Sequence, residues 1–220
     1  MRIACVQHPY CTEVILNYPQ GRNALDTDGW HALAETVRGV DRTLPLMFRG
    51  EGDHFCAGFD LKQWKTLDVN QRRDALQVME TALNQVLDHP HLTISRLTGA
   101  VWGGGLALAL VTDWRQARLP MTIGLPMIRM GVTPPNSVQK TLRLLLGTRK
   151  TKWLLWRGHP IDGKELRQTD LVDDWVPDGP WGSIESDAAD LVTNQSFFKT
   201  VRAGRPEKFL HDHYRVESES

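Results

Sequence analysis

The chain has 220 residues, of which 24% are charged and 41% hydrophobic, and its 26 basic residues balance its 26 acidic residues. This length predicts one globular domain, because a chain of this size buries roughly 70% of its unfolded surface. The balanced charge creates no field that attracts nucleic acid or an anionic membrane. No apolar run approaches the roughly 20 residues that cross a bilayer. We therefore expect no nucleic acid and no membrane as partners.

Two further features favour a cytoplasmic protein. The opening "MRIACVQHPY" has one basic residue and lacks the apolar core of a signal peptide. The three cysteines, Cys5, Cys11 and Cys56, are odd in number and form no C-x-x-C pair. Cysteines in this pattern are typical of reduced thiols in a cytoplasmic chain.

Short apolar runs alternate with amphipathic segments along the first hundred residues. Strand-like runs cover 12–17, 44–50 and 92–97, and helical patterns cover 26–40 and 70–89. Strands separated by helices imply crossover connections and a mostly parallel sheet. The sequence therefore predicts an α/β fold.

The pattern becomes helical after residue 137. Ser137 is a candidate N-cap, and Gly147 and Gly158 are candidate helix ends. These signals predict several helices in the last third of the chain.

Three consecutive glycines interrupt the stretch "GAVWGGGLALALVTDW" at 99–114, which is otherwise typical of a buried helix. Each glycine inside a helix costs about 1 kcal/mol relative to alanine. A phosphate-binding loop would need a later lysine or glycine, and neither follows Gly105. An oxyanion hole, in which backbone N–H groups stabilise charge on a carbonyl oxygen, needs a second donor, and "FCAGFDL" at 55–61 could supply it. The glycines could equally serve only close helix packing.

Five segments carry a family resemblance. They are "LNYPQGRNALD" (16–26), "FCAGFDL", "GAVWGGGLALALVTD", "GLPMIRMGVTPPNS" and "GHPIDGKELRQTDLVDDWVP" (158–177), in order from about residue 12 to 177. Together they resemble the crotonase superfamily of enoyl-CoA hydratases and isomerases. The resemblance implies a crotonase-like spiral of ββα units with a helical C-terminal part. Residues 1–220 would form a single domain, with a spiral core at about 1–135, a helical trimerisation region at about 136–220, and assembly into a homotrimer or hexamer.

The resemblance also implies roles for particular residues. The N–H groups of Phe59 and Gly104 would form the oxyanion hole for an acyl thioester, and a side chain at position 104 would obstruct the thioester oxygen. The backbone of Cys56, Ala57 and Gly58 would line the path of coenzyme A. Arg22 would contact the coenzyme phosphates, or would be a solvated surface arginine. The side chains of Asn23, Asp60 and Asp113 are interpreted as structural hydrogen-bonding groups.

Two departures from the family pattern restrict the chemistry. The positions of the two glutamates that handle water in hydratases are Ala107 and Met127. Apolar walls would come from Phe59, Trp102, Ala107, Met127 and Pro134. Decarboxylation of a malonyl-type or glutaconyl-type thioester needs an enolate stabiliser and an apolar pocket, so it is favoured over hydration. Coenzyme A or the phosphopantetheine of an acyl carrier protein would be the substrate handle, with no tightly bound cofactor.

Three alternatives stay open. A double-bond isomerase would need another base in the pocket. A catalytically silent, crotonase-like binding or scaffold subunit would explain the missing glutamates but not the retained "AGFD" and "GGG". A serine hydrolase is disfavoured because no G-x-S-x-G motif occurs.

The histidines supply no clear base or metal ligand. His54 is predicted on a surface loop, and His89 and His91 flank Pro90 on a loop predicted to be exposed. The "HDH" at 211–213 has metal-like spacing but lacks a third ligand pattern, so we expect no metal site.

Overall fold

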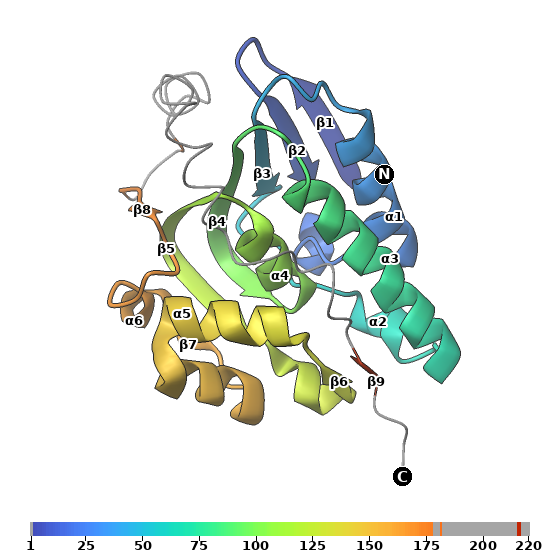
Figure 1. The fold of residues 1–220 in the computed structure, drawn as a ribbon, viewed down its shortest axis with the longest axis vertical. Helices are drawn as coiled ribbons and strands as arrows, with labels where there is room; N and C mark the ends of the chain where they lie inside the picture. Colours follow the sequence, from blue (N-terminus) through green and yellow to red (C-terminus); the bar gives the residue numbers. More distant parts are fainter. Residues whose placement is uncertain (1, 178–180, 182–214, 217–220) are drawn as a thin grey trace.

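A mostly parallel sheet forms the centre of the computed structural model, which describes residues 2–177, 181 and 215–216 (Figure 1). Its strand order is β1-β2-β3-β4-β5-β7, and β8 also pairs with β5. The strands β2, β3, β4 and β5 run parallel, and β1 and β7 are antiparallel to their neighbours. The strand bounds are β1 (Ile3–Gln7), β2 (Thr12–Leu16), β3 (Leu46–Gly50), β4 (Thr93–Trp102), β5 (Trp114–Gly124), β7 (Ile161–Asp162) and β8 (Asp174–Trp175).

Two long helices, α1 (Thr27–Gly39) and α3 (Val69–Leu87), pack against each other beside the sheet (Figure 1). Asp26 caps α1 by accepting a hydrogen bond from the Gly29 amide. Asp68 and Gln71 form a reciprocal capping box at the start of α3. Each helix buries one apolar stripe, as its periodic sequence requires.

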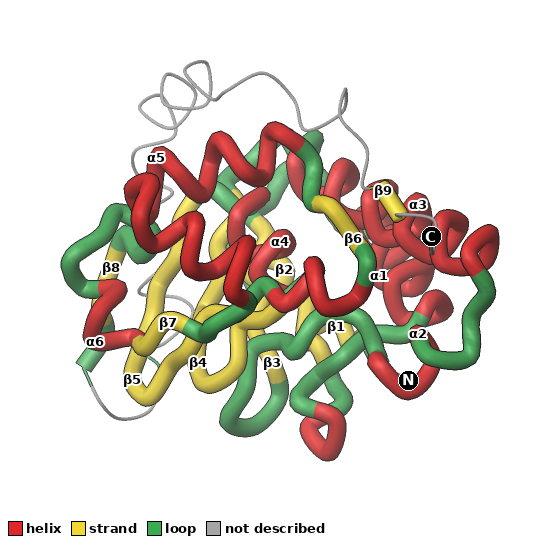
Figure 2. The backbone as a smooth tube through the Cα atoms, turned by 90° about the horizontal axis from the view of Figure 1, so that it is seen from below, coloured by secondary structure: helices red, strands yellow, loops and turns green. Residues whose placement is uncertain are grey.

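The short helix α4 (Gly104–Val111) lies at the centre of the molecule, and every one of its residues is buried. It contacts β4 and β5 on one side and α3 and α5 (Asn136–Lys152) on others (Figure 2). The remaining elements are η1 (Pro19–Gly21), α2 (Leu61–Trp64), η2 (Pro126–Met130), β6 (Val132–Thr133), η3 (Trp153–Arg157), α6 (Gly163–Leu166) and β9 (Arg215–Val216). Burial from all sides explains why α4 is apolar around its whole circumference.

The predicted strands and helices of the first hundred residues are confirmed within a few residues at their ends, apart from β4, which continues past its predicted end. The prediction for 99–114 is wrong in its first part, because β4 continues through Trp102 and the helix begins only at Gly104. The strands β1 and β5 were not predicted. Polar residues inside β5 hide its signal: Arg115 and Gln116 are buried, and both bond acidic residues that follow at 173 and 174.

The helical signals after residue 137 are partly confirmed. Ser137 is not the N-cap, since α5 begins at Asn136 after Pro135 with no side-chain cap. Gly147 interrupts α5 with a positive φ of 73°, and Gly158 ends η3 in the left-handed conformation. Beyond α6 the chain returns to the main sheet through β8, so the region from 136 onward is not purely helical in its described part.

No helix among the described residues combines the length and the apolarity needed to cross a membrane.

Candidate active site

The segment 55–58 runs beside the end of β4, which brings the two glycine-containing motifs together. The amide of Phe55 donates to the Thr98 carbonyl at 2.8 Å, and the amide of Cys56 donates to the Ala100 carbonyl at 3.0 Å. The Trp102 amide donates a 2.9 Å hydrogen bond to the Cys56 carbonyl. These ladder-like bonds set Gly58 directly against the start of α4.

A second segment, 22–25, holds 55–58 from the other side. The Ala57 amide donates to the Arg22 carbonyl at 2.9 Å, and the Leu25 amide donates to the Gly58 carbonyl at 2.9 Å. The Arg22 side chain is exposed. The structure therefore places Arg22 beside the backbone of Ala57; its contact with coenzyme phosphates stays a prediction.

Each of the three glycines at the start of α4 meets a different demand. Gly103 has a φ of 52°, a conformation that side chains disfavour. A Cβ on Gly105 would lie 2.3 Å from the Cys56 carbonyl oxygen. A Cβ on Gly104 would lie 2.6 Å from Cζ2 of Trp30 and 2.9 Å from Sδ of Met79. The expectation that a side chain at 104 would obstruct a thioester oxygen is thus wrong, because that side chain would point into the core.

Gly58 completes the close approach. Its φ is 89°, and a Cβ there would lie 2.7 Å from the Gly104 nitrogen and 2.6 Å from the Trp102 carbonyl oxygen. A glycine at position 58 therefore lets the backbone of one motif touch the first turn of α4. The sequence signal for this contact was the A-G pair of "FCAGFDL".

The amides of Phe59 and Gly104 are the ones predicted to bind a thioester oxygen. Among the residues that the structure describes, neither nitrogen donates a backbone hydrogen bond. Gly104 is the first residue of α4, where the helix leaves its amides without an internal acceptor. Backbone amides without an acceptor can stabilise negative charge, most of all at a helix start. Gly104 N–H and Phe59 N–H, which follows directly on the Gly58 that lies against Gly104, are therefore candidate donors. We call Phe59 N–H and Gly104 N–H the amide pair.

The Cys56 thiol fixes the turn that leads to this pair. Its Sγ donates to the Asn23 carbonyl at 3.1 Å and accepts from the Gly58 amide at 3.3 Å. Complete burial raises the pKa of Cys56 to about 12, so the thiol is protonated and can donate. Cys56 is therefore a neutral support and not a nucleophile.

The predicted pocket residues differ in how deeply they are buried. Ala107 and Met127 both belong to the main apolar core, with 1% and 7% of their surface exposed. Pro134 is buried and leads into α5. Trp102 is half-buried; its ring packs on Gly124, and its Nε1 donates to Thr122 at 3.1 Å. Apolar side chains thus fill the core at positions 107 and 127; that these positions correspond to the two glutamates of hydratases stays a prediction.

The other polar residues near the site are engaged in structural bonds. The Asn23 side chain bonds the backbone of Tyr18, Glu51 and His54. Asp60 caps α2 and pairs with Arg2 at 3.1 Å. Asp113 accepts from Thr93, which agrees with its structural interpretation.

The histidine predictions need correction. His54 is half-buried, and its Nδ1 accepts from the Ala100 amide at 3.1 Å. His89 is fully buried, with its Nε2 2.8 Å from the Leu44 carbonyl, and His91 is half-buried. The loop is covered because the end of α3 packs over the segment before β3. The "HDH" at 211–213 lies outside the described residues, and no cluster of three metal-binding side chains occurs within them.

A family model described as enoyl-CoA hydratase/isomerase matches residues 11–194. The chain belongs to the enoyl-CoA hydratase/isomerase family. It is 30% identical over 183 residues to an enoyl-CoA isomerase/hydratase of Zymoseptoria tritici, covering 79% of this chain and 60% of the relative. It is 33% identical over 165 residues to the human mitochondrial enoyl-CoA hydratase domain-containing protein 2, covering 73% of this chain and 56% of that protein. The chain thus spans less than two thirds of these relatives.

Solved structures of this family share the fold. A crystal structure assigned as an enoyl-CoA hydratase/isomerase from Bordetella parapertussis superposes with a TM-score of 0.83 at 22% identity, covering 95% of this chain and 88% of its own. An enoyl-CoA hydratase from Bacillus anthracis gives a TM-score of 0.77 at 24% identity, covering 89% and 77%. The crotonase-like α/β fold predicted from the motifs is confirmed.

Sequence reasoning missed two residues that shape the site. Trp30 of α1 and Met79 of α3 form the floor against which Gly104 packs. Their spacing indicates only a buried helix face, and contact with α4 depends on how three helices assemble. Nothing in the local sequence around either residue signals this role.

Proposed function

We propose that this protein stabilises the enolate of an acyl thioester through the amide pair, and that the reaction is decarboxylation. The observation that carries the proposal is the close approach of Gly58, the residue before Phe59, to the Gly104 nitrogen. The amides of Phe59 and Gly104 have no backbone acceptor among the described residues. Charge that develops on a thioester oxygen would be stabilised by two such donors. Removing one donor of this kind typically costs about 3 kcal/mol of transition-state stabilisation.

Decarboxylation fits a site that lacks carboxylates. When the bond between the carboxylate and the α-carbon of a malonyl-type thioester breaks, its electron pair passes to the thioester and neutral CO₂ leaves. The enolate then takes one proton from water to give the shortened acyl thioester. No side chain has to remove a proton, whereas hydration and isomerisation both require one to do so.

The apolar flank supports the same choice. Ala107 and Met127 offer the substrate carboxylate no hydrogen bond, whereas the CO₂ that leaves carries no charge and loses nothing in apolar surroundings. A double-bond isomerase is the second candidate within the family, but it would need a base that the described residues do not place at α4.

The substrate handle in this proposal is coenzyme A or a carrier-protein phosphopantetheine, with no tightly bound cofactor. The exposed Arg22 beside 56–58 supports a phosphate-bearing handle. A homotrimer or hexamer and a cytoplasmic setting remain predictions; the human relative is named as mitochondrial.

The test is a product assay with malonyl-CoA, methylmalonyl-CoA and glutaconyl-CoA in deuterated water. We expect one of them to lose CO₂ and to gain a solvent deuteron at the carbon that carried the carboxylate. Solvent-derived deuterium exchange without carbon loss would favour isomerisation. A protein that binds these thioesters and changes none of them would support the silent-scaffold alternative and contradict the proposal.

A further inference from the structure

The outward face of α5 and η3 has an unusual composition. Its exposed side chains are Lys140, Arg143, Leu144, Arg149, Lys152, Trp153, Trp156 and Arg157, and we call this set the α5–η3 face. No aspartate or glutamate occurs from residue 136 to residue 160. In a chain with no net charge, this face is a concentrated positive region.

Large apolar side chains lie among these cations. Leu144 is 72% exposed, Trp153 54% and Trp156 65%. Lys152 lies 5.1 Å from the centre of the Trp156 ring, and Arg157 lies 5.7 Å from that of Trp153. Tryptophan and arginine are the residues most enriched among binding hot spots, so the exposure of both on one face indicates an interaction surface.

A pocket opens beside Trp153. Its lining consists of Arg149, Lys150, Trp153, Pro160, Ile161 and Glu165. Apolar atoms of the tryptophan, the proline and the isoleucine give it a floor suited to one side chain of a partner. The two cations at its rim suit an acidic neighbour of that side chain.

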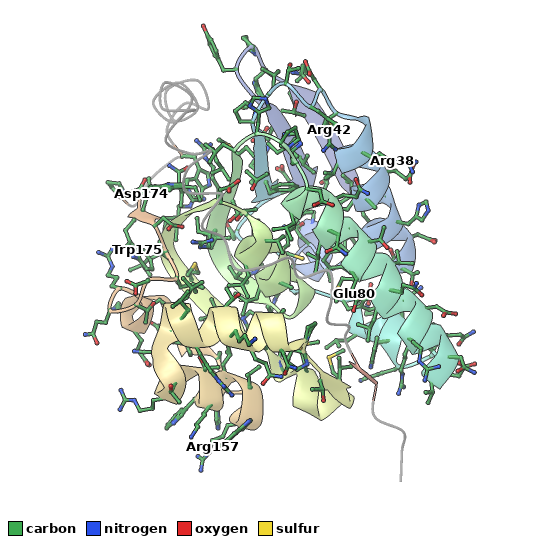
Figure 3. All side chains as sticks on the ribbon, viewed as in Figure 1. Arg38, Arg42, Glu80, Arg157, Asp174 and Trp175 are labelled. Atoms are coloured by element: carbon green, nitrogen blue, oxygen red, sulfur yellow. The ribbon has the colours of Figure 1, made fainter. Side chains whose placement is uncertain are left out.

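The α5–η3 face lies close to the candidate site. The η3 turn packs against η2, which carries Met127. In Figure 3, Arg157 projects from the lower edge of the molecule, away from α1 and α3. A partner bound to this face would therefore contact η3, which packs directly against the element that carries Met127.

We propose that the α5–η3 face docks an acidic protein domain, and that this domain is the acyl carrier protein that presents the thioester. The choice of carrier rests on the proposed function, while the choice of an acidic protein rests on the charge of the face. A second copy of this chain fits less well, because pairing the α5–η3 face with itself would set like cations against one another. An anionic membrane also fits less well, because the exposed Asp162 and Glu165 border the face and only three large apolar side chains lie on it.

Binding of an apo acyl carrier protein, which bears no phosphopantetheine, separates docking from chemistry. We expect titration calorimetry of the 220-residue chain at low salt to give a micromolar Kd that weakens as salt is raised. Lys152→Glu with Arg157→Glu should weaken binding at least tenfold. Arg38→Glu with Arg73→Glu is the matched control, since it makes the same charge change on α1 and α3 and should alter Kd less than twofold. Figure 3 shows Arg38 on the side of the molecule away from Arg157.

Several results would overturn the docking proposal. The first is that the carrier does not bind at low salt. The second is that both charge-reversed pairs weaken binding equally. The third is that Lys152→Glu with Arg157→Glu mainly lowers the oligomeric mass measured by sedimentation. Binding of phosphatidylglycerol vesicles through Lys152 and Arg157, without carrier binding, would assign the face to a membrane instead. The apo carrier cannot react, so this binding test still decides the docking proposal if the protein proves not to be a decarboxylase. In the same way, the assay with coenzyme A thioesters still decides the proposed function if the carrier does not bind.

Discussion

Two sides of α4 differ in what they retain of the family's chemistry. At its start, Gly58 and the glycines at 103–105 let two backbone segments approach closely enough to hold the amide pair. Three residues after Gly104, Ala107 presents only apolar atoms, and so does Met127, a member of the same core. In our proposal the first side stabilises an oxyanion, whereas the side chains of Ala107 and Met127 cannot move a proton.

If the proposal holds, charge stabilisation and proton transfer depend on different parts of this molecule. The amide pair belongs to the backbone, and its position depends on the glycines and on the strand pairing. The acid and base are single side chains, and each can be replaced by an apolar residue that fits the core. The predictions below test the two sides separately, from the largest expected effect to the smallest.

Hydration of crotonyl-CoA tests the apolar side. Acid–base groups contribute about a hundredfold to ten-thousandfold, so we expect turnover about a thousandfold below that of an ordinary hydratase. The measurement is the loss of enoyl absorbance with time. Turnover within tenfold of an ordinary hydratase would mean that other side chains supply the acid and the base, and that the roles assigned to positions 107 and 127 are wrong.

Adding the glutamates back sharpens that test. Ala107→Glu with Met127→Glu should introduce trace hydration if the protein tolerates two buried carboxylates. Circular dichroism of the variant distinguishes a folded, inactive protein from an unfolded one. A folded variant without any hydration would weaken the assignment of these two positions.

Gly58→Ala breaks the amide side. The new Cβ would combine a positive φ of 89° with a 2.6 Å approach to the Trp102 carbonyl. Strain and overpacking of this kind cost about 1–3 kcal/mol each, so we expect the free energy of unfolding to fall by about 2–6 kcal/mol, with loss of turnover. Gly39→Ala is the control, because no atom lies within 4 Å of its new Cβ; urea titration of both variants gives the comparison.

Gly104→Ala should cost about 1–3 kcal/mol, because its Cβ meets Trp30 and Met79. Trp30→Phe removes the ring atoms that the new Cβ at position 104 would meet. It also removes an indole N–H that has no partner in the described structure. The double variant should therefore be more stable than the sum of the two single effects predicts, and should regain turnover. If stability returns and turnover does not, the glycine is needed at the reacting oxygen and the packing account is wrong.

The pH dependence of stability tests the support under the amide pair. Burial raises the pKa of Cys56 from 9.0 to about 12, so above pH 9 the unfolded thiol loses its proton while the folded thiol keeps it. The free energy of unfolding should therefore fall as pH rises, by up to about 1.4 kcal/mol per pH unit from this group. Cys56→Ser keeps the donor and does not titrate in this range. Urea titrations at pH 8, 9 and 10 should show a shallower fall in the variant, and identical slopes would contradict the assignment.

Much of the fold could be predicted because its signals are local. The periodicity of 70–89 and the apolar runs at 12–17 and 44–50 predict α3, β2 and β3 with nearly correct ends. The strand β5 could not be predicted, since Arg115 becomes acceptable inside a sheet only through its 2.7 Å pair with Asp173, far along the chain. His89 was misplaced for the same reason, because its partner is the distant Leu44 carbonyl.

The candidate site divides in a similar way. The motifs indicated which two backbone segments would meet, and the backbone bonds between 55–58 and β4 bring those segments together. The direction of the Gly104 Cβ could not be predicted, since it depends on where α1 and α3 set Trp30 and Met79. Motifs report which residues a family needs, whereas the packing around them follows from the assembled helices.

The most direct test of the central claim is the infrared stretching frequency of a ¹³C-labelled thioester carbonyl in bound propionyl-CoA, which cannot decarboxylate. If the amides of Phe59 and Gly104 both donate to this oxygen, the carbonyl is polarised and its frequency falls below the value in water. The difference between spectra of labelled and unlabelled propionyl-CoA, both at saturating protein concentration, isolates the signal of the bound carbonyl. A frequency equal to the solution value, with binding demonstrated in the same sample, would contradict the claim that the amide pair is an oxyanion hole.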